Sequence, residues 1–413
     1  MSAKWKLICA VLVVLLLGGI LMSVLLFGGD KLYATGDWLQ MSGNKNGPRY
    51  VVDADGKPFR LFGIARCQYH EDFEKEIMDK TYGRETDAYD FAVYYKNLGM
   101  NCIRYSIYYH RHNRPGENLI EECGGFNEAG INKYINDYVN PDLQKIMDAG
   151  MYVILDMHEY PHPTDKDDPN PAEILKIAHD EYIPLWIELA KRYKDEPRIA
   201  ILELWNEPYA ADQESLKLDD EGKIASGAYK GYDWNSGVVQ FFIDCVAAVR
   251  KYDTRHIILV SDWNAGWGSG WAKSWKNKNA EPKRQKNLYV DGNRNIIFSV
   301  HANNYHINFD GAWYDNYWYD LANKNNIGLH FGEVELEGGD MDAGAMSTFI
   351  KMLEDRQAKQ GNWLKPIKPC NFSAVLWRPH LDDETDGDDY ASIWSDFAKV
   401  YANPVPFTPN LYS

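Results

Sequence analysis

The sequence predicts an α/β protein, a single (β/α)8 TIM barrel preceded by an N-terminal transmembrane segment. Eight short apolar runs alternate with segments of helical apolar spacing, as in a closed parallel barrel. Several of these runs end in polar residues that could take part in catalysis, and the first 30 residues contain a long uncharged stretch. An open doubly wound sheet is the alternative, but no Gly-rich phosphate loop follows the first predicted strand.

The uncharged stretch, Leu7 to Phe27, contains 21 residues and follows Lys4 and Lys6. At ~1.5 Å per residue, a helix of this length is about 31 Å long, which matches the hydrocarbon core of a bilayer. The two lysines favour a cytoplasmic N-terminus. We therefore expect a cell-membrane protein with its catalytic domain outside, or a secreted one if the stretch is a cleaved signal peptide. The predicted division is a cytoplasmic N-terminus at 1–6, a signal anchor at 7–27, a connector at 28–48 and the barrel at 49–413.

The charge balance limits the possible partners of the barrel. The formal net charge is −16 and the isoelectric point is about 5.2, without a cluster of Lys and Arg. Nucleic acid is excluded as a partner because neutralising phosphates requires clustered basic residues. A neutral substrate fits best. The six cysteines lack metal-ligand spacing, and Cys102 and Cys245 are expected to be packing residues.

The predicted elements begin with Tyr50-Val-Val-Asp-Ala-Asp-Gly-Lys, in which Asp-Gly between apolar flanks predicts a small hairpin that caps the domain. Helical spacing of apolar residues follows later, for example at 186, 189, 190 and 193 and at 238, 242, 245 and 249. Gly99 and Gly150 mark the ends of two helical segments. The eight predicted strands are Leu61–Ala65, Cys102–Ile107, Tyr152–Met157, Ile199–Trp205, His256–Val260, Ile296–Val300, Ile327–Phe331 and Phe372–Trp377.

Two glutamates follow predicted strands at the end where barrel enzymes carry their catalytic residues. Glu207 ends the run Ile-Leu-Glu-Leu-Trp-Asn-Glu, and Glu333 ends the run Ile-Gly-Leu-His-Phe-Gly-Glu. Glu203, Trp205 and Glu207 alternate along one strand, so we expect them to face the same side. Either glutamate alone could be a solvated loop carboxylate. Enzymes that break glycosidic bonds typically use two carboxyl groups that face each other across the bond.

Further candidate residues end the strands in a fixed order: Arg104, His158, Asn206 before Glu207, His301, then Trp377 after Glu333. This order resembles glycoside hydrolase family 5, the cellulase-like retaining β-glycanases of clan A, over roughly Tyr50 to Ala402. The resemblance implies a hydrolase of O-glycosyl compounds that needs no cofactor and uses two glutamates in a double displacement. The implied substrate is a neutral β-linked polysaccharide or oligosaccharide, with β-1,4-glucan ahead of β-mannan.

The resemblance also implies a role for each residue. Glu333 would be the nucleophile, ionised and held by Arg104, whose positive charge favours the carboxylate. Glu207 would be the general acid and base, with a raised pKa. The other positions would bind the sugar or orient Glu207: Asn206 at the 2-hydroxyl, His158 in the same subsite, His301 beside Glu207 and Trp377 under the reacting ring.

The sequence departs from the family after the sixth strand. The family usually has His-x-Tyr there, whereas this chain has His301-Ala-Asn303-Asn304-Tyr305. Either Asn303 replaces the tyrosine, or Tyr305 reaches the nucleophile. Trp263 and Trp267 follow the fifth strand and could stack on sugar or pack on the barrel.

Several alternatives stay open. Arg104 could be a partner of Glu203 inside the barrel, and His158 a core histidine. A metal-dependent hydrolase would use Asp156, His158 and His162, but His158-Glu-Tyr-Pro-His162 is not the His-Glu-x-x-His motif, so no metal is expected. A barrel that binds glycan without cleaving it, or a transglycosidase on the same scaffold, would share the predicted site. The sequence leaves the sugar, its linkage and the oligomeric state undetermined.

Overall fold

The computed structural model describes residues 38–43, 47–67, 91–97, 100–110, 118–158, 171–208, 222–261, 286–302, 322–334 and 372–376. All of them belong to the compact unit Trp38–Ser413, which is separate from the unit Met1–Asp37. The expected membrane segment at 7–27 lies outside the described residues and stays a prediction. Within the described ranges, none of the helices combines the length and the apolar character needed to cross a bilayer.

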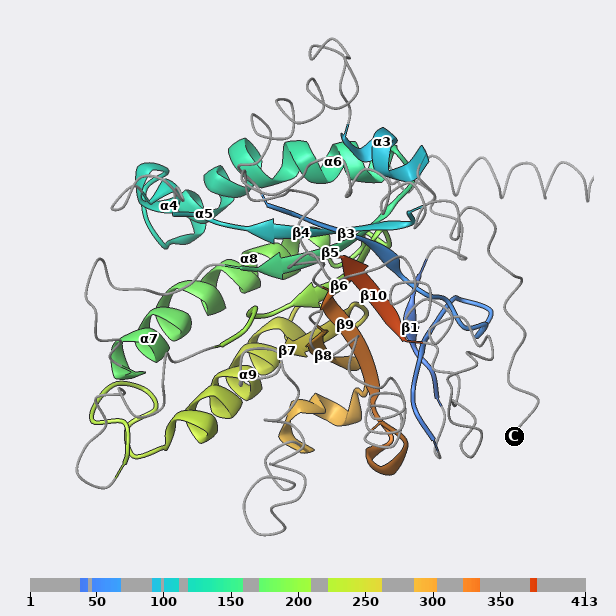
Figure 1. Cartoon of the computed structure of the whole chain (residues 1–413). Helices are drawn as coiled ribbons and strands as arrows, with labels where there is room; N and C mark the ends of the chain where they lie inside the picture. The colour runs from blue at the N-terminus through green and yellow to red at the C-terminus, as the bar shows by residue number, and fades with distance from the viewer. Residues whose placement is uncertain are drawn as a thin grey trace, which may run out of the picture. The chain divides into compact units, whose positions relative to one another are not determined.

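Eight parallel strands form a closed barrel, in the order β10-β3-β4-β5-β6-β7-β8-β9 (Figure 1). The closed ring confirms the predicted barrel and excludes the open sheet. Two strands match their predicted ranges at both ends, whereas β6 ends two residues early, at Glu203 instead of Trp205. The barrel strands are β3 (Phe62–Cys67), β4 (Cys102–Ile107), β5 (Tyr152–Met157), β6 (Ile199–Glu203), β7 (Ile257–Ser261), β8 (Ile296–Ala302), β9 (Gly328–Val334) and β10 (Ser373–Leu376).

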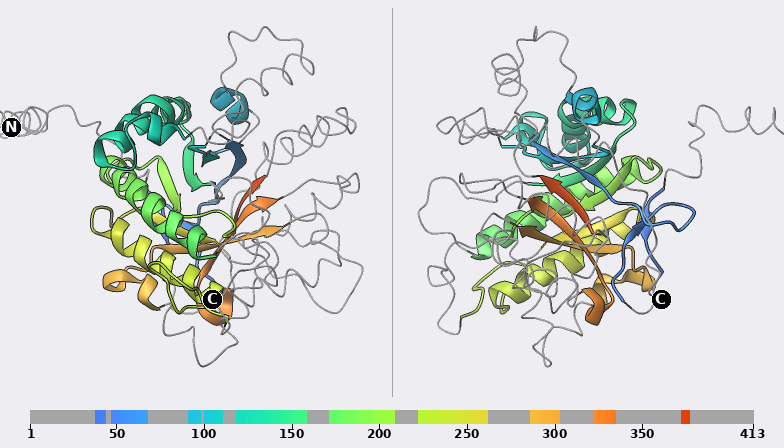
Figure 2. Two further views of the ribbon diagram at one scale, coloured as in Figure 1. Left: turned by 90° about the vertical axis from the view of Figure 1, so that its left-hand side faces the viewer. Right: turned by 45° about the vertical axis from the view of Figure 1, so that its right-hand side comes forward.

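Helices lie on the outer side of the barrel, and Figures 1 and 2 show α6, α8 and α9 following one another along strands β4 to β7. The apolar residues predicted on α8 and α9 are all buried, as are Cys102 and Cys245. Gly150 follows α6 with a φ of +76°, a left-handed conformation that ends the helix. The described helices are α3 (Phe91–Asn97), α4 (Leu119–Glu122), α5 (Glu128–Tyr134), η3 (Ile135–Val139), α6 (Asn140–Asp148), α7 (Pro171–Ile177), η4 (Ala178–Tyr182), α8 (Ile183–Tyr193), α9 (Trp234–Arg250), η5 (Lys286–Leu288) and η6 (Val290–Gly292).

The barrel interior changes from apolar to polar along the strands. Cys102, Ile154 and Ile201 belong to an apolar cluster near the beginnings of the strands. Further along β4, β5 and β6, Arg104, Asp156 and Glu203 are all fully buried. A buried charged residue requires ionic and hydrogen-bonding partners. The second halves of β4, β5 and β6 therefore supply a polar cluster beneath the mouth of the barrel.

The opposite end of the barrel is closed by the predicted hairpin. In this hairpin β2 (Val51–Val52) pairs antiparallel with the segment after the turn through Val52 and Pro58, and the Asp53 N–H donates to the Lys57 carbonyl at 2.9 Å to close the turn. β1 (Gln40–Met41) pairs antiparallel with β2 as well. Met41 and Val51 join the apolar cluster inside the barrel. The hairpin therefore completes the core and leaves the C-terminal ends of the strands for a site.

Candidate active site

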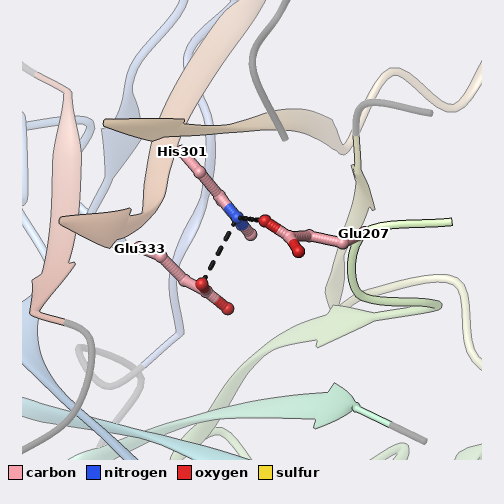
Figure 3. A group of neighbouring side chains, drawn as sticks. All are labelled: Glu207, His301 and Glu333. Carbon is pink, nitrogen blue, oxygen red and sulfur yellow. Dashed lines mark hydrogen bonds and ion pairs between the residues drawn. The ribbon is translucent and has the colours of Figure 1, made fainter. Parts of the chain in front are cut away.

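The two predicted catalytic glutamates and His301 lie together at the C-terminal ends of the strands (Figure 3). Glu207 follows β6, His301 is on β8 and Glu333 is on β9. His301 Nδ1 is 2.5 Å from Glu207 Oε1 and 3.4 Å from Glu333 Oε2. The predicted contact between His301 and Glu207 is therefore confirmed, and the same nitrogen also faces Glu333.

Glu207 lies in this position because β6 ends before residue 207, so the backbone no longer follows the regular course of a strand there. β6 ends at Glu203, and Glu207 has a φ of +37° directly before Pro208. A left-handed non-glycine residue carries backbone strain, and a following proline restricts it further. The expectation that Trp205 faces the same side as Glu203 and Glu207 is wrong. The Trp205 ring packs outward against Phe241 of α9, with ring centroids 5.2 Å apart, because the strand alternation stops at Glu203.

Glu333 reaches the site through an irregularity in β9. Val300 pairs with Phe331 and the next residue, His301, pairs with Glu333, so Gly332 is an extra residue on β9. An extra residue of this kind reverses which side of a strand the following side chain faces. A Cβ at position 332 would lie 2.2 Å from Ser299 Oγ and 3.1 Å from His301 Nε2. Only glycine leaves room for Ser299 and His301 here.

Arg104 connects Glu333 to the buried cluster below it. Its Nη1 donates to Glu333 Oε1 at 2.9 Å, while Nε and Nη2 donate to the two oxygens of Glu203 at 2.6 and 3.0 Å. The two interpretations of Arg104, as a holder of Glu333 and as a partner of Glu203, are thus both correct. Burial alone would lower the pKa of Arg104, but Asp156, Glu203 and Glu333 outweigh it and raise this pKa.

Asn206 and His158 lie beside Arg104, as expected for one subsite. Arg104 Nη2 donates to Asn206 Oδ1 at 2.7 Å, and Asn206 Nδ2 lies 3.1 Å from His158 Nε2. The other ring nitrogen of His158 is 2.6 Å from Asp156 Oδ2. His158 is also 4.0 Å from Glu333 Oε1 through Nε2. Together with His301, these contacts place four of the predicted site residues around the Glu207–Glu333 pair.

The comparisons with known proteins agree with this geometry. The family model described as cellulase, glycosyl hydrolase family 5, matches residues 52–368. The chain belongs to glycosyl hydrolase family 5 and is a glycosidase. The matched range contains both glutamates of the family 5 site and ends before Trp377. No match is found among curated protein sequences.

Solved structures share the fold of this family 5 chain at low sequence identity. A β-glucanase from Saccharophagus degradans is 15% identical with a TM-score of 0.53, covering 89% of this chain and 94% of the other. The same β-glucanase in complex with cellotetraose has a TM-score of 0.52 at 15% identity and covers 90% and 98%. The mannotriose complex of a Thermomonospora fusca β-mannanase is 16% identical with a TM-score of 0.50, covering 91% and 93%.

The ionisation of the family 5 site differs from the expectation for Glu333. Burial raises the pKa of Glu333 to about 8, with Glu207 and Asp156 adding to the rise and His301 and Arg104 opposing it. The expected contact with Arg104 is present, but it does not offset the loss of water around a side chain that is only 5% exposed. The same cause raises the pKa of Asp156 to about 6, although Arg104, Ser106 and His301 oppose it. Burial lowers the pKa of His301.

The side-chain positions also bear on metal binding. Glu207, His301 and Glu333 offer ligand atoms within 4.8 Å of one another, so these three side chains together could hold a metal ion. The alternative set of Asp156, His158 and His162 is disfavoured because both ring nitrogens of His158 already have partners, Asp156 and Asn206. His162 lies outside the described residues.

Some predicted residues of the site cannot be placed. Trp263, Trp267, Asn303, Tyr305 and Trp377 lie outside the described residues, so their predicted contacts with sugar or nucleophile stay predictions. Conversely, the sequence pattern indicates Asp156 only as a metal ligand. Asp156 lies on β5, two residues before His158. The alternation of a strand puts positions 156 and 158 on one side, and that signal could have identified Asp156 as a partner of His158.

Proposed function

We propose that this family 5 glycosidase is a retaining β-glycanase that hydrolyses a neutral β-linked polysaccharide or its oligosaccharides. The observation that carries the proposal is the meeting of Glu207 and Glu333 around His301 Nδ1, above Arg104. The two carboxyls come from the ends of separate strands, β6 and β9, and both are partly shielded from water at the mouth of the barrel. A double displacement at an anomeric carbon requires two carboxyl groups of this kind.

In the first step, a Glu333 oxygen attacks the anomeric carbon while Glu207 gives its proton to the departing glycosidic oxygen. The C–O bond to the leaving sugar breaks, and a covalent glycosyl ester forms on Glu333. In the second step, Glu207 takes a proton from a water molecule, which attacks the same carbon and releases Glu333. The nucleophile must start ionised and the acid must start protonated, so the pair needs one proton in total.

The contacts of the two glutamates support Glu333 as the nucleophile and Glu207 as the general acid and base. Arg104 donates to Glu333 at 2.9 Å and favours its carboxylate, whereas Glu207 Oε1 lies 2.5 Å from His301 Nδ1. His301 Nδ1 can donate to Glu207 Oε1 and leave Oε2 to carry the catalytic proton. The shared proton would therefore reside on Glu207 when substrate is bound.

The substrate class follows from charge and from the structural neighbours. The chain carries a formal charge of −16, which favours a neutral glycan over an anionic one. Structures of similar fold contain cellotetraose or mannotriose. We therefore place β-1,4-glucan first and β-mannan second, with the enzyme held at the cell surface by residues 7–27.

The test uses the full-length protein in mild detergent, incubated with a panel of β-glucans and β-mannans, with the anomeric form of the first product followed by ¹H NMR. We expect the wild-type enzyme to release the β-anomer and Glu333→Gln to release nothing. Glu128→Gln, at an exposed position on α5, is the matched control and should behave like the wild type.

Three outcomes would contradict the proposal. Initial release of the α-anomer would mean an inverting reaction, in which neither glutamate forms a covalent bond. Unimpaired cleavage by Glu333→Gln would mean a different nucleophile. Retention on a glycan by both proteins without cleavage would support the binding-only barrel.

A further inference from the structure

The buried groups beneath the candidate site form a hydrogen-bond chain with a defined direction. Arginine carries only donors, so the Asn206 atom at 2.7 Å from Arg104 Nη2 is the acceptor Oδ1. The Asn206 amide nitrogen must then face His158 Nε2, at 3.1 Å. An amide nitrogen donates only, so Nε2 accepts and the proton of the imidazole is on Nδ1.

Asp156 is the group that receives this proton. His158 Nδ1 donates to Asp156 Oδ2 at 2.6 Å, and Ser106 Oγ donates to the same oxygen at 2.8 Å. Arg104 Nη2 lies 3.1 Å from it as well. Two donors and the positive charge of Arg104 thus converge on one oxygen of a fully buried carboxylate, whereas its Oδ1 has no partner among the described residues.

Arg104 and Asp156, at the two ends of the chain, both oppose the other direction. If Nε2 carried the proton, Asn206 would have to turn its amide oxygen toward His158. Its NH2 group would then face the Arg104 guanidinium, and two donors would meet in a buried site. In the observed direction, one N–H of Asn206 donates to His158. The second N–H has no hydrogen-bond partner in the part of the chain that the structure describes and is available to a ligand.

We infer that Asp156 is a positioning residue: by fixing the Nδ1–H form of His158, it orients the Asn206 amide to donate an N–H to the sugar hydroxyl beside the reacting carbon. This inference rests on the proposed function for the identity of the ligand. The orientation of the amide itself rests only on the contacts of Arg104, Asp156, His158 and Asn206.

Two substitutions at position 156 separate the hydrogen bond from the negative charge. Asp156→Asn can place its carbonyl oxygen where His158 and Ser106 donate and its NH2 group at the Oδ1 position, so it keeps the acceptor and loses the charge. Asp156→Ala removes the acceptor. We expect only the Nδ1–H form of His158 in the wild type and Asp156→Asn. In Asp156→Ala we expect a mixture with the Nε2–H form, because Nδ1–H has lost its acceptor and Arg104 alone opposes the other direction.

The first readout is the ¹⁵N NMR spectrum of histidine-labelled full-length protein, in which the two neutral forms of imidazole have different nitrogen shifts. The His158 signals are assigned by their loss in His158→Gln. An Nε2–H form in the wild type overturns the inference, whether or not Asp156→Ala folds. An unchanged spectrum in Asp156→Ala also overturns it. This readout needs no substrate, so it stands even if the proposed function fails.

The second readout is kcat/KM for an aryl β-glycoside and its 2-deoxy counterpart. In Asp156→Ala, the advantage of the 2-hydroxyl substrate should fall by about tenfold or more, the size of one well-formed hydrogen bond to a polar group. Asp156→Asn should keep that advantage, whatever its effect on the absolute rates. Equal losses on both substrates in Asp156→Ala would indicate a merely structural role and overturn the inference.

Discussion

At the scale of single residues, Glu333 combines a proposed chemical role with an unfavourable environment. Its ordinary pKa is 4.5, and burial raises this pKa to about 8. A carboxyl whose pKa is higher in the folded than in the unfolded protein binds an extra proton in the folded state between those two values. Its contribution to the free energy of unfolding is therefore fully present below pH 4.5 and is lost as the pH rises through 8.

Glu333→Gln should consequently be more stable than the wild type at pH 8 and above, because glutamine cannot ionise in the buried site. The difference in melting temperature should shrink as the pH falls toward 4.5. Thermal unfolding of both proteins across this range measures the effect, with Glu128→Gln as the exposed control. A constant difference at all pH values would show that ionisation of Glu333 does not govern it. Greater stability with lost activity is a common result at catalytic positions.

Glu207 and Glu333 should titrate as a pair, since His301 Nδ1 contacts both. We expect a bell-shaped pH dependence of kcat/KM, with an alkaline fall near pH 8 as the pair loses its last proton and with it the general acid. A dinitrophenyl glycoside needs no protonation of its leaving group. With this substrate, Glu207→Gln should retain the first step and show no alkaline fall. An alkaline fall that persists in this variant would belong to another group.

At the scale of elements, the site depends on where strands stop being regular. The apolar runs and their polar ends could be predicted from the sequence, because strand burial and the position of catalytic residues in barrels follow general rules. The end of β6 at Glu203 and the extra residue at Gly332 could not be predicted. Both depend on contacts with neighbouring strands: the side chains of Ser299 and His301 leave room only for glycine at 332.

Gly332→Ala tests this close approach. The added methyl would overlap Ser299 Oγ, 2.2 Å away, and press on His301 Nε2 at 3.1 Å. We expect His301 to lose its position between the glutamates and kcat/KM to fall by about 100-fold, as for a misplacement of about 1 Å. Ser299→Ala removes the first overlap, and Ser299 Oγ has no partner among the described residues. The double variant should therefore recover part of the lost rate, whereas Ser299→Ala alone should keep it.

The measurement is a double-mutant cycle of kcat/KM over the two single variants and the double variant. Strictly additive effects would contradict a steric conflict between positions 299 and 332. Folding of each variant is checked by thermal unfolding, since an overlap within the barrel also lowers stability.

At the scale of the whole molecule, the barrel separates a stabilising end from a reactive end. The small sheet of β1 and β2 closes the first end, where Arg49 Nε donates to the Ser42 carbonyl at 2.7 Å and Nη1 donates to the Arg294 carbonyl at 2.6 Å. The reactive end is formed by strand ends and by segments that follow them. The fold class, the hairpin and the pairing of the two glutamates were predictable, because each depends on local patterns. The roles of Trp263 and Tyr305 were not, since an aromatic residue that follows a strand in the sequence can either stack on sugar or pack on the barrel.

This separation predicts that stability can be changed without changing catalysis. Met41 of β1 is 5% exposed and packs inside the barrel base, where its Cε lies 2.2 Å from the position that a Cβ on Gly328 would take. Met41→Ala should lower the free energy of unfolding by about 2–5 kcal/mol, as for other large-to-small core substitutions. Its kcat/KM well below the unfolding temperature should equal that of the wild type, because the strands hold Glu207 and Glu333 at the opposite end.

Denaturant unfolding and initial rates measure the two quantities, with Val93→Ala, 45% exposed on α3, as the control for a change at the surface. A parallel loss of kcat/KM in Met41→Ala would mean that packing at the hairpin end determines the geometry of the glutamates, and that the two ends of the barrel are mechanically coupled.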